Sequence, residues 1–236
     1  MTTDQQKAKQ IVGRAAADLV EDGMRLGLGT GSTTACALEA LGRRIAEEGL
    51  TVAGVPTSFA AERLARRHGI PLTTLDDVAA LDLALDGADE VAEADGRFLL
   101  IKGRGGAHTR EKIVAAAAER FVVLVDPSKE VERLGTTMPV PVEVLPMAVA
   151  PLARSIRALG GEPELRMGEK KDGPVVTDQG FWILDAMFGP IADPADLDAA
   201  IHSLPGVLDH GLFLGLATDV LVGEPDGTVR HRRAAP

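Results

Sequence analysis

Residues 27–34, GLGTGSTT, place three glycines and several hydroxyl side chains where an apolar strand pattern changes to a helical one. Glycines let the backbone approach an anion closely, and the free N–H groups and positive dipole end of a helix N-terminus favour a phosphate there. The candidate phosphate-binding residues are Thr30, Gly31, Ser32 and Thr33. A nucleotide is disfavoured, because Ser32 stands where a dinucleotide fingerprint has its third glycine and no P-loop lysine follows. The alternative is a capped turn without a ligand, in which Ser32 is the N-cap residue.

Residues 86–90, DGADE, close the apolar segment LDLALD with two acids three residues apart. Carboxylates at the carboxyl end of a strand can bind a cation, orient sugar hydroxyls or exchange protons with them. Asp86 and Asp89, with Gly87 and Ala88 between them, are therefore candidates for contact with a substrate. The pattern alone also fits a solvated Asp-Gly turn that ends a strand.

Residues 102–112, KGRGGAHTREK, gather basic side chains in a chain whose net charge is -10. The basic residues are Lys102, Arg104, Arg110 and Lys112. Their local positive field suits an anionic substrate, and Lys102 could stabilise an oxyanion that develops on a carbonyl oxygen. Glu111 could carry a proton, although a carboxylate in the first turn of a helix is also favoured by the helix dipole. His108 has no acid paired with it in the sequence, so we expect a packing or surface role for it.

The composition limits the classes of partner. A chain of 236 residues with 45% hydrophobic side chains can bury a substantial core. A net charge of -10 without a polybasic run disfavours nucleic acid and anionic membranes as partners. The single cysteine, Cys36, and the absence of a Cys/His zinc spacing indicate a reducing compartment, and the N-terminal segment lacks the apolar run of a signal peptide. We therefore expect a soluble, cytoplasmic protein.

The first 130 residues alternate between strand and helix patterns. This alternation predicts an α/β fold with a doubly wound parallel sheet of about five or six strands. Such sheets bind ligands at the carboxyl ends of their strands. Each of the three motifs follows a strand-like segment, so the sequence places all three at one edge of the predicted sheet.

The pattern changes after Lys129. The proline-rich residues 138–146, MPVPVEVLP, are interpreted as a crossover rather than a strand, with a domain boundary near Gly135. Beyond the boundary, we expect a small α+β domain. Its predicted elements are a helix over 148–159, strands over 164–167, 175–178 and 181–188, and a helix capped by Asp193. The apolar residues 211–223 predict a buried strand pair, which belongs either to this domain or to the first sheet.

The ordered motifs resemble one family, ribose-5-phosphate isomerase of type A. Besides the three segments above, the segments DPSK, PVEVLP, VVTD and GVLDHGLF occur in the family's order, so the resemblance covers nearly the whole chain. It implies a Rossmann-like parallel-sheet domain, residues 1–134 and 208–236, interrupted by a smaller α+β, ferredoxin-like domain, residues 135–207.

The resemblance also implies an activity. The expected reaction interconverts D-ribose 5-phosphate and D-ribulose 5-phosphate through an enediol, in the non-oxidative pentose phosphate pathway. It implies that no metal ion or other cofactor takes part and that the protein is a homodimer.

The resemblance assigns roles to single residues. Glu111 matches the family's proton-transferring carboxylate and Lys102 a lysine near the reacting oxygens. Asp86 and Asp89 match catalytic acids that contact the sugar, open its furanose ring and pass protons between the two reacting oxygens. The substrate-binding residues that it implies are Lys9, Thr30, Gly31, Ser32, Thr33, Asp86, Gly87, Ala88, Asp89, Lys102, Gly103, Arg104, Gly105 and Lys129. Two positions depart from the family's pattern, since Arg104 replaces a glycine and His108 a hydrophobic residue. The departures bear on the substrate range and the rate.

Two other functions fit parts of the pattern. One is a different sugar-phosphate enzyme on the same scaffold, such as an amino-sugar phosphate deaminase or a lactonase. The other is a sugar-phosphate sensor that keeps the phosphate turn but does not need Glu111. An assay for the ketose product separates these functions.

Overall fold

A computed structural model describes residues 3–235, and its larger part is a six-stranded sheet with the strand order β13-β12-β6-β3-β1-β2. The strands are β1 (Arg25–Leu28), β2 (Ala53–Pro56), β3 (Leu81–Gly87), β6 (Ala118–Val125), β12 (Asp219–Gly223) and β13 (Val229–Arg233). All neighbours in the sheet are parallel except the edge strand β13, which is antiparallel to β12. The predicted α/β fold with a parallel sheet is confirmed.

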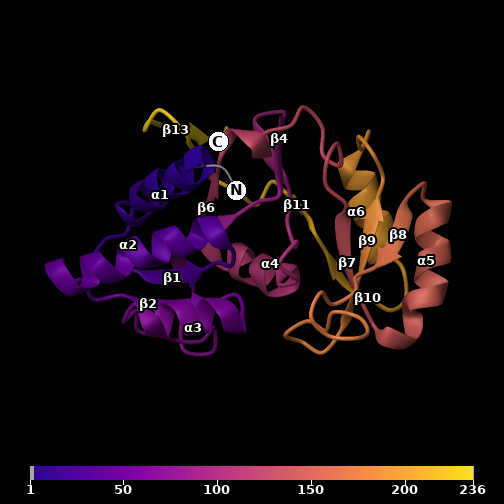
Figure 1. The fold of residues 1–236 in the computed structure, drawn as a ribbon, viewed down its shortest axis with the longest axis horizontal. Helices are drawn as coiled ribbons and strands as arrows, with labels where there is room; N and C mark the ends of the chain where they lie inside the picture. Colours follow the sequence, from indigo (N-terminus) through magenta and orange to yellow (C-terminus); the bar gives the residue numbers. More distant parts are fainter. Residues whose placement is uncertain (1–2, 236) are drawn as a thin grey trace.

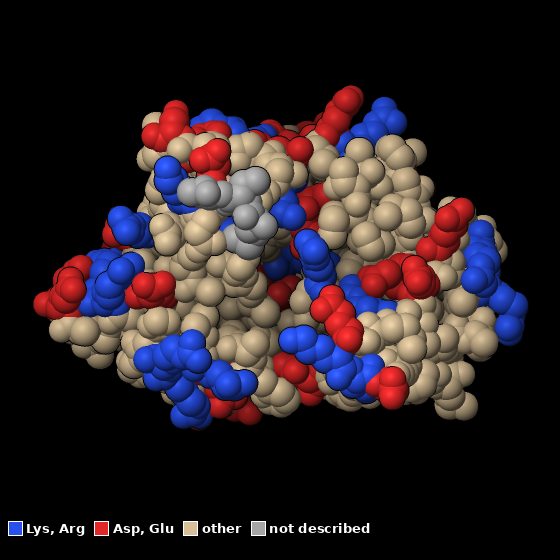
Figure 2. All heavy atoms as spheres, viewed as in Figure 1, with Lys and Arg blue, Asp and Glu red and all other residues tan. Residues whose placement is uncertain are grey.

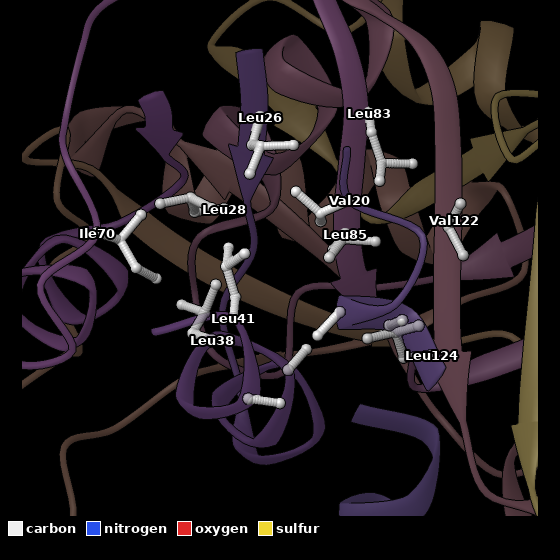
Figure 3. Packing of buried hydrophobic residues seen from close by; sticks show 14 of the residues in the cluster. Val20, Leu26, Leu28, Leu38, Leu41, Ile70, Leu83, Leu85, Val122 and Leu124 are labelled. Carbon is white, nitrogen blue, oxygen red and sulfur yellow. The ribbon is translucent and has the colours of Figure 1, made fainter. Parts of the chain in front are cut away.

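Helices and a small sheet cover the two faces of this sheet. Its helices are α1 (Thr3–Ala17), α2 (Ser32–Glu48), α3 (Phe59–Arg67) and α4 (His108–Ala116). The first three lie on one face, where apolar residues of β1, β3 and β6 pack against α2 (Figure 3). Residues Phe121–Val125 of β6 are all buried, because both faces of a covered parallel sheet are apolar. This sheet with its helices is called the first lobe below.

The other face of the sheet carries α4 and a three-stranded antiparallel sheet. Its strands, in the order β11-β5-β4, are β4 (Glu90–Ala94), β5 (Arg97–Ile101) and β11 (Leu212–Leu214). The hairpin between β4 and β5 turns at Asp95 and Gly96, which both have positive φ as a tight primed turn requires. Through this sheet the chain segment that ends in Lys102 crosses from the first lobe toward the rest of the molecule.

The remaining elements form a second lobe, which lies beside the first (Figure 1). Its antiparallel sheet, in the order β10-β7-β9-β8, consists of β7 (Val140–Val144), β8 (Glu162–Leu165), β9 (Trp182–Met187) and β10 (Val207–His210). Its helices are α5 (Val149–Ala158) and α6 (Pro194–His202). Two short 3-10 helices are also present: η1 (Pro127–Lys129) follows β6, and η2 (Pro146–Ala148) follows β7. A third apolar core holds this α+β unit together and also includes Ala92, Ile101 and Leu212 of the three-stranded sheet.

The proline-rich segment is a strand, so the prediction of a crossover over residues 138–146 was wrong. All residues of β7 are buried, and β7 pairs with both β9 and β10. Pro141 is tolerated because it is the second residue of the strand, where its carbonyl still accepts a hydrogen bond from Gly211 N. The prediction of a strand over residues 175–178 was also wrong, since Thr177 closes a tight turn with Gly180 and Phe181.

The C-terminal segment returns to the first lobe, as one of the two alternatives for residues 211–223 stated. β11 joins the three-stranded sheet, and β12 lies beside β6 in the large sheet. The boundaries at 134/135 and 207/208 stay a prediction, and the second one falls within β10. Residues 1, 2 and 236, which the expected ranges include, lie outside the described residues. None of the helices in residues 3–235 is long and apolar enough to span a lipid bilayer.

Candidate active site

The three motifs meet at one cavity of about 330 Å³ at the carboxyl ends of the parallel strands. The turn after β1, the end of β3 and the loop after β5 all contribute to its wall. Every substrate-binding residue implied by the sequence lines this cavity except Asp86, which is buried beneath it. Leu124 and Val125, at the end of β6, complete the wall and were missed, because their sequence reads only as a buried strand. Figure 2 shows acidic and basic side chains meeting where this face is hollowed between the lobes.

The turn at residues 30–33 presents a helix N-terminus without a side-chain cap. The N-cap residue of α2 is Gly31, with φ 111, and Ser32 is the first helical residue. The alternative in which Ser32 caps the helix was therefore wrong. Ser32 Oγ instead accepts a hydrogen bond of 2.8 Å from Lys9 Nζ. The first N–H groups of α2, with Lys9 and the nearby Lys129, suit a phosphate group.

Asp86 connects the turn at residues 30–33 to the buried side chain of Lys102. Its Oδ1 accepts hydrogen bonds from Thr30 N at 3.0 Å and Gly87 N at 2.8 Å. The turn can pass this close because residue 29 is glycine, since a Cβ on Gly29 would lie 2.3 Å from the Asp86 carboxylate. Asp86 is 2% exposed, so its carboxylate interacts with neighbouring side chains and is not part of the exposed cavity wall.

Lys102 lies between two buried carboxylates. Its Nζ is 3.0 Å from Asp86 Oδ2 and 3.2 Å from Glu111 Oε2, and it donates a hydrogen bond of 2.6 Å to Gly87 O. Burial lowers the pKa of Lys102, but the charges of Asp86 and Glu111 outweigh burial and raise the pKa above its ordinary value. Lys102 is therefore a fixed positive charge at the bottom of the cavity.

Glu111 is a carboxylate that can bind or release a proton near neutral pH. It occupies the first turn of α4 and is 5% exposed. Burial and the charge of Asp86 raise the pKa of Glu111 to about 8, against the opposing effect of Lys102. A group whose pKa lies near the working pH is suited to act as both general base and general acid.

Asp89 and the loop that follows Lys102 form a further part of the cavity wall. Asp89 Oδ2 accepts a hydrogen bond of 3.0 Å from Arg104 N. Gly103 and Gly106 have φ of 106 and 73, in the left-handed region that glycine adopts without strain. The exposed Arg104 stands at the rim of the cavity.

The hydroxyl of Thr30 belongs to a small network that sequence reasoning missed. Thr30 Oγ1 lies 2.8 Å from Thr57 Oγ1 and 2.7 Å from Ser58 Oγ. Both partners follow β2 at its carboxyl end, and Ser58 also caps α3 by accepting a hydrogen bond from Ala61 N. The position of Thr57 and Ser58 at the carboxyl end of a parallel strand was the sequence signal that could have identified them. The network fixes the rotamer of Thr30 beside the cavity.

His108 is fully buried beneath the loop and does not line the cavity. A Cβ on Gly103 would lie 2.8 Å from His108 Nδ1, so the ring packs against the loop backbone. Burial lowers the pKa of His108 to about 3, which keeps the ring neutral. Of the two roles expected for His108, the structure shows packing.

Within the described residues, one group of side chains has the spacing of metal ligands, and it lies outside the cavity. Asp198 and His202 on α6 lie close to His210 on β10. The two histidines hydrogen-bond to each other, His210 Nε2 to His202 Nδ1, at 2.8 Å. His210 Nδ1 accepts a hydrogen bond from Leu212 N at 3.3 Å. Hydrogen bonds thus already use the ring nitrogens of His210.

Comparisons with known proteins agree over most of the chain. The family model described as ribose 5-phosphate isomerase A (phosphoriboisomerase A) matches residues 53–227. A relative from Thermosynechococcus vestitus, named ribose-5-phosphate isomerase A, is 61% identical over 92% of this chain and 91% of its own length. The solved structure of ribose 5-phosphate isomerase A from Methanocaldococcus jannaschii is 49% identical with a TM-score of 0.91, and covers 96% of this chain and 98% of that one.

A further solved structure, of a D-ribose-5-phosphate isomerase in complex with phospho-erythronic acid, is 43% identical with a TM-score of 0.93. The match covers 99% of this chain and 100% of that one, so both lobes correspond. Sequence, fold and the length of the chain therefore lead to the same assignment. The chain belongs to the ribose 5-phosphate isomerase A family of enzymes.

Proposed function

We propose that this protein interconverts D-ribose 5-phosphate and D-ribulose 5-phosphate through an enediol intermediate, with Glu111 carrying the proton and without a metal ion. The observation that carries this proposal is the buried group of Glu111, Lys102 and Asp86 at the bottom of a cavity whose other end is an uncapped helix N-terminus. The complex of a relative with phospho-erythronic acid supports a phosphorylated sugar-like ligand.

Binding comes first. The phosphate lies against the N–H groups of residues 30–33, with Lys9 and Lys129 as cationic partners. The sugar then extends toward Lys102 and Glu111. The two acids have different roles because they lie at different places. Asp89 lines the cavity and contacts the sugar hydroxyls and the ring oxygen during ring opening. The buried Asp86 does not line the cavity, and its charge instead shifts the pKa values of Lys102 and Glu111.

Proton transfer follows on the open-chain sugar. Glu111 removes the proton from C2 of the aldose, the C1 carbonyl becomes an enediolate, and the positive charge of Lys102 stabilises the developing oxyanion. A proton moves from the oxygen on C2 to the oxygen on C1, and Glu111 returns its proton to C1. The product is the ketose, and the enzyme regains its starting state.

We propose that the reaction belongs to the non-oxidative pentose phosphate pathway, because both its substrate and its product are pentose phosphates. We further propose that the protein acts as a cytoplasmic homodimer, and light scattering of the purified protein tests the dimer.

A ketose assay tests the proposal. Purified protein is incubated with ribose 5-phosphate, with and without a chelator, and ribulose 5-phosphate is measured. The proposal predicts ketose at the same rate in both samples. Absence of ketose would contradict the isomerase reaction, and loss of activity with the chelator would contradict the metal-free mechanism. Parallel samples with an amino-sugar phosphate and a sugar-phosphate lactone test the deaminase and lactonase alternatives, while tight binding of ribose 5-phosphate without turnover would indicate a sensor.

A further inference from the structure

The side chain of Arg166, in the second lobe, hydrogen-bonds to the loop after Lys102. Arg166 Nη1 donates hydrogen bonds of 3.0 Å to the carbonyl oxygens of both Gly103 and Arg104. Its Nε and Nη2 donate to the two carboxylate oxygens of Asp185, at 2.7 and 2.5 Å. The side chain is only 16% exposed. Arg166 therefore links β9, which carries Asp185, to the backbone of the cavity wall.

Only arginine can make this arrangement. Its planar guanidinium presents five N–H donors in a fixed fork, so that one edge pairs with a carboxylate while the remaining nitrogen binds other acceptors. The backbone of Arg166 is fixed as well, because its N–H donates to Ile183 O and its carbonyl accepts from Val175 N, both at 2.9 Å. The guanidinium therefore has a defined place relative to the second lobe.

The two carbonyl contacts determine where the neighbouring N–H groups point. In a trans peptide, the carbonyl and the following N–H point in opposite directions, and no described peptide bond is cis. Since Gly103 O faces Arg166, Arg104 N faces away, and it meets Asp89 Oδ2 at 3.0 Å. Since Arg104 O also faces Arg166, the N–H of Gly105 likewise faces away from the second lobe.

Gly105 lines the cavity, and its N–H has no acceptor within residues 3–235. A Cβ at this position would lie 3.7 Å from Thr30 Cγ2, so the residue borders the phosphate turn. A backbone donor that is oriented in advance toward a ligand oxygen needs no reorganisation during the reaction. The orientation of this donor depends on the peptide that Arg166 holds.

We propose that Arg166, with Asp185, is a positioning residue for the reaction: it orients the Gly105 N–H toward an oxygen of the sugar phosphate and keeps Asp89 in place through Arg104 N. The second lobe thereby takes part in the active site without contacting the substrate. The proposal rests on the proposed isomerase reaction, and the experiment below separates the two.

A small hollow makes the proposal testable by chemical rescue. It has a volume of about 220 Å³ and is lined by Asp89 and Arg104 on one side and by Arg166 and Asp185 on the other. In Arg166→Ala, free guanidinium can enter from this hollow and occupy the place of the lost group between Asp185 and the two carbonyls. Methylammonium, a point charge without the fork, cannot bridge these acceptors.

The experiment compares kcat and KM of the wild type and Arg166→Ala with ribose 5-phosphate. We expect kcat to fall about ten- to a hundredfold, with a smaller change in KM, because misplacement of the loop acts mainly on the transition state. Guanidinium, far below denaturing concentrations, restores part of kcat, and methylammonium does not. The control is Arg157→Ala: Arg157 lies on α5 in the same lobe, and within residues 3–235 its guanidinium donates a hydrogen bond only to Ala153 O of its own helix. It keeps its kcat and does not respond to guanidinium.

Wild-type kcat in folded Arg166→Ala overturns the inference, and so does a loss that guanidinium fails to restore. If Arg166→Ala does not fold, Asp185→Asn tests the same link, because it leaves Arg166 without its ionic partner. This variant is expected to lose several-fold in kcat while it stays folded, and an unchanged kcat overturns the inference. A wild-type protein without isomerase activity contradicts the proposed function instead, so the two failures are distinguishable.

Discussion

Lys102 Nζ lies 3.2 Å from Glu111 Oε2, and the two side chains are 3% and 5% exposed. The pair shares its surroundings with Asp86, whose Oδ2 is 3.0 Å from the same nitrogen. One buried cation thus stands between two carboxylates. This arrangement holds a proton acceptor and a stabiliser of negative charge together, and it depends on all three members.

Replacement of Lys102 by methionine tests the central cation. We expect Lys102→Met to lose about 10²–10³-fold in kcat, because the developing enediolate loses its stabilising charge. The variant also unfolds at a lower temperature, since two buried carboxylates remain without a cation. Lys112→Met is the control: Lys112 lies on α4 next to Glu111 and pairs with Asp209 of β10 at 2.5 Å, but it does not line the cavity. It loses stability with a much smaller change in kcat. Equal losses of kcat in both variants would contradict the role of Lys102.

The pH profile tests the effect of Asp86 on Glu111. Because the pKa of Glu111 is raised to about 8, kcat/KM rises with pH through this region as Glu111 loses its proton. Asp86→Asn removes a negative charge that raises this pKa, so the rising limb moves to lower pH. Asp82→Asn, at an exposed position near the start of the same strand, leaves the rising limb of the pH profile in place. A limb that stays fixed in Asp86→Asn would show that another group controls the profile.

Two glycines with positive φ, one at each end of α2, test the phosphate turn. Gly31, with φ 111, begins α2, and Gly49, with φ 75, ends it. Alanine costs about 1–2 kcal/mol of stability at Gly49, which is left-handed, and about 1–3 kcal/mol at Gly31, whose ψ of 172 puts it in a region that is essentially limited to glycine. We expect Gly31→Ala to raise the KM for ribose 5-phosphate as well, and Gly49→Ala to leave it unchanged. An unchanged KM in Gly31→Ala, measured on folded protein, would speak against a phosphate at this turn.

His108 makes the protein sensitive to acid. Its pKa is lowered to about 3 in the folded state, mainly by burial, so the unfolded chain binds a proton first as the pH falls below about 6.5. Native stability is therefore lost between about pH 6.5 and pH 3. We expect His108→Leu to move the midpoint of acid unfolding to lower pH, as followed by circular dichroism. Comparison of the stabilities of the wild type and His108→Leu at pH 8, where the histidine is neutral in both the folded and the unfolded chain, separates this effect from altered packing. An unchanged midpoint of acid unfolding would mean that His108 contributes nothing to the acid sensitivity.

The sequence allowed the first lobe and most of the cavity to be predicted for a physical reason. Parallel strands bring their carboxyl ends to one edge, so motifs that follow three strands had to lie close together. The covered strands read as apolar runs, as residues 121–125 of β6 show, and glycines mark the close approaches near Asp86 and at α2.

The second lobe could be predicted less well, because its interactions are long-range. β7 is a strand despite Pro141, since the missing N–H falls near the strand start, and only the tertiary pairing shows this. Thr177 lies in a strand-like run, yet its hydroxyl accepts from Phe181 N and donates to the buried Glu143, which favours a turn. Arg166 stands 62 or more residues from the carbonyls that it binds, and nothing local indicates that contact.

Proton transfer by Glu111 is tested by the turnover number of Glu111→Gln with ribose 5-phosphate, measured together with the affinity for the substrate. The substitution is nearly isosteric and removes only the proton acceptor. We expect kcat to fall about 10²–10⁴-fold while the affinity stays within about tenfold of the wild type. A kcat near the wild-type value would show that Glu111 does not carry the proton, and would make Asp86 the next residue to test.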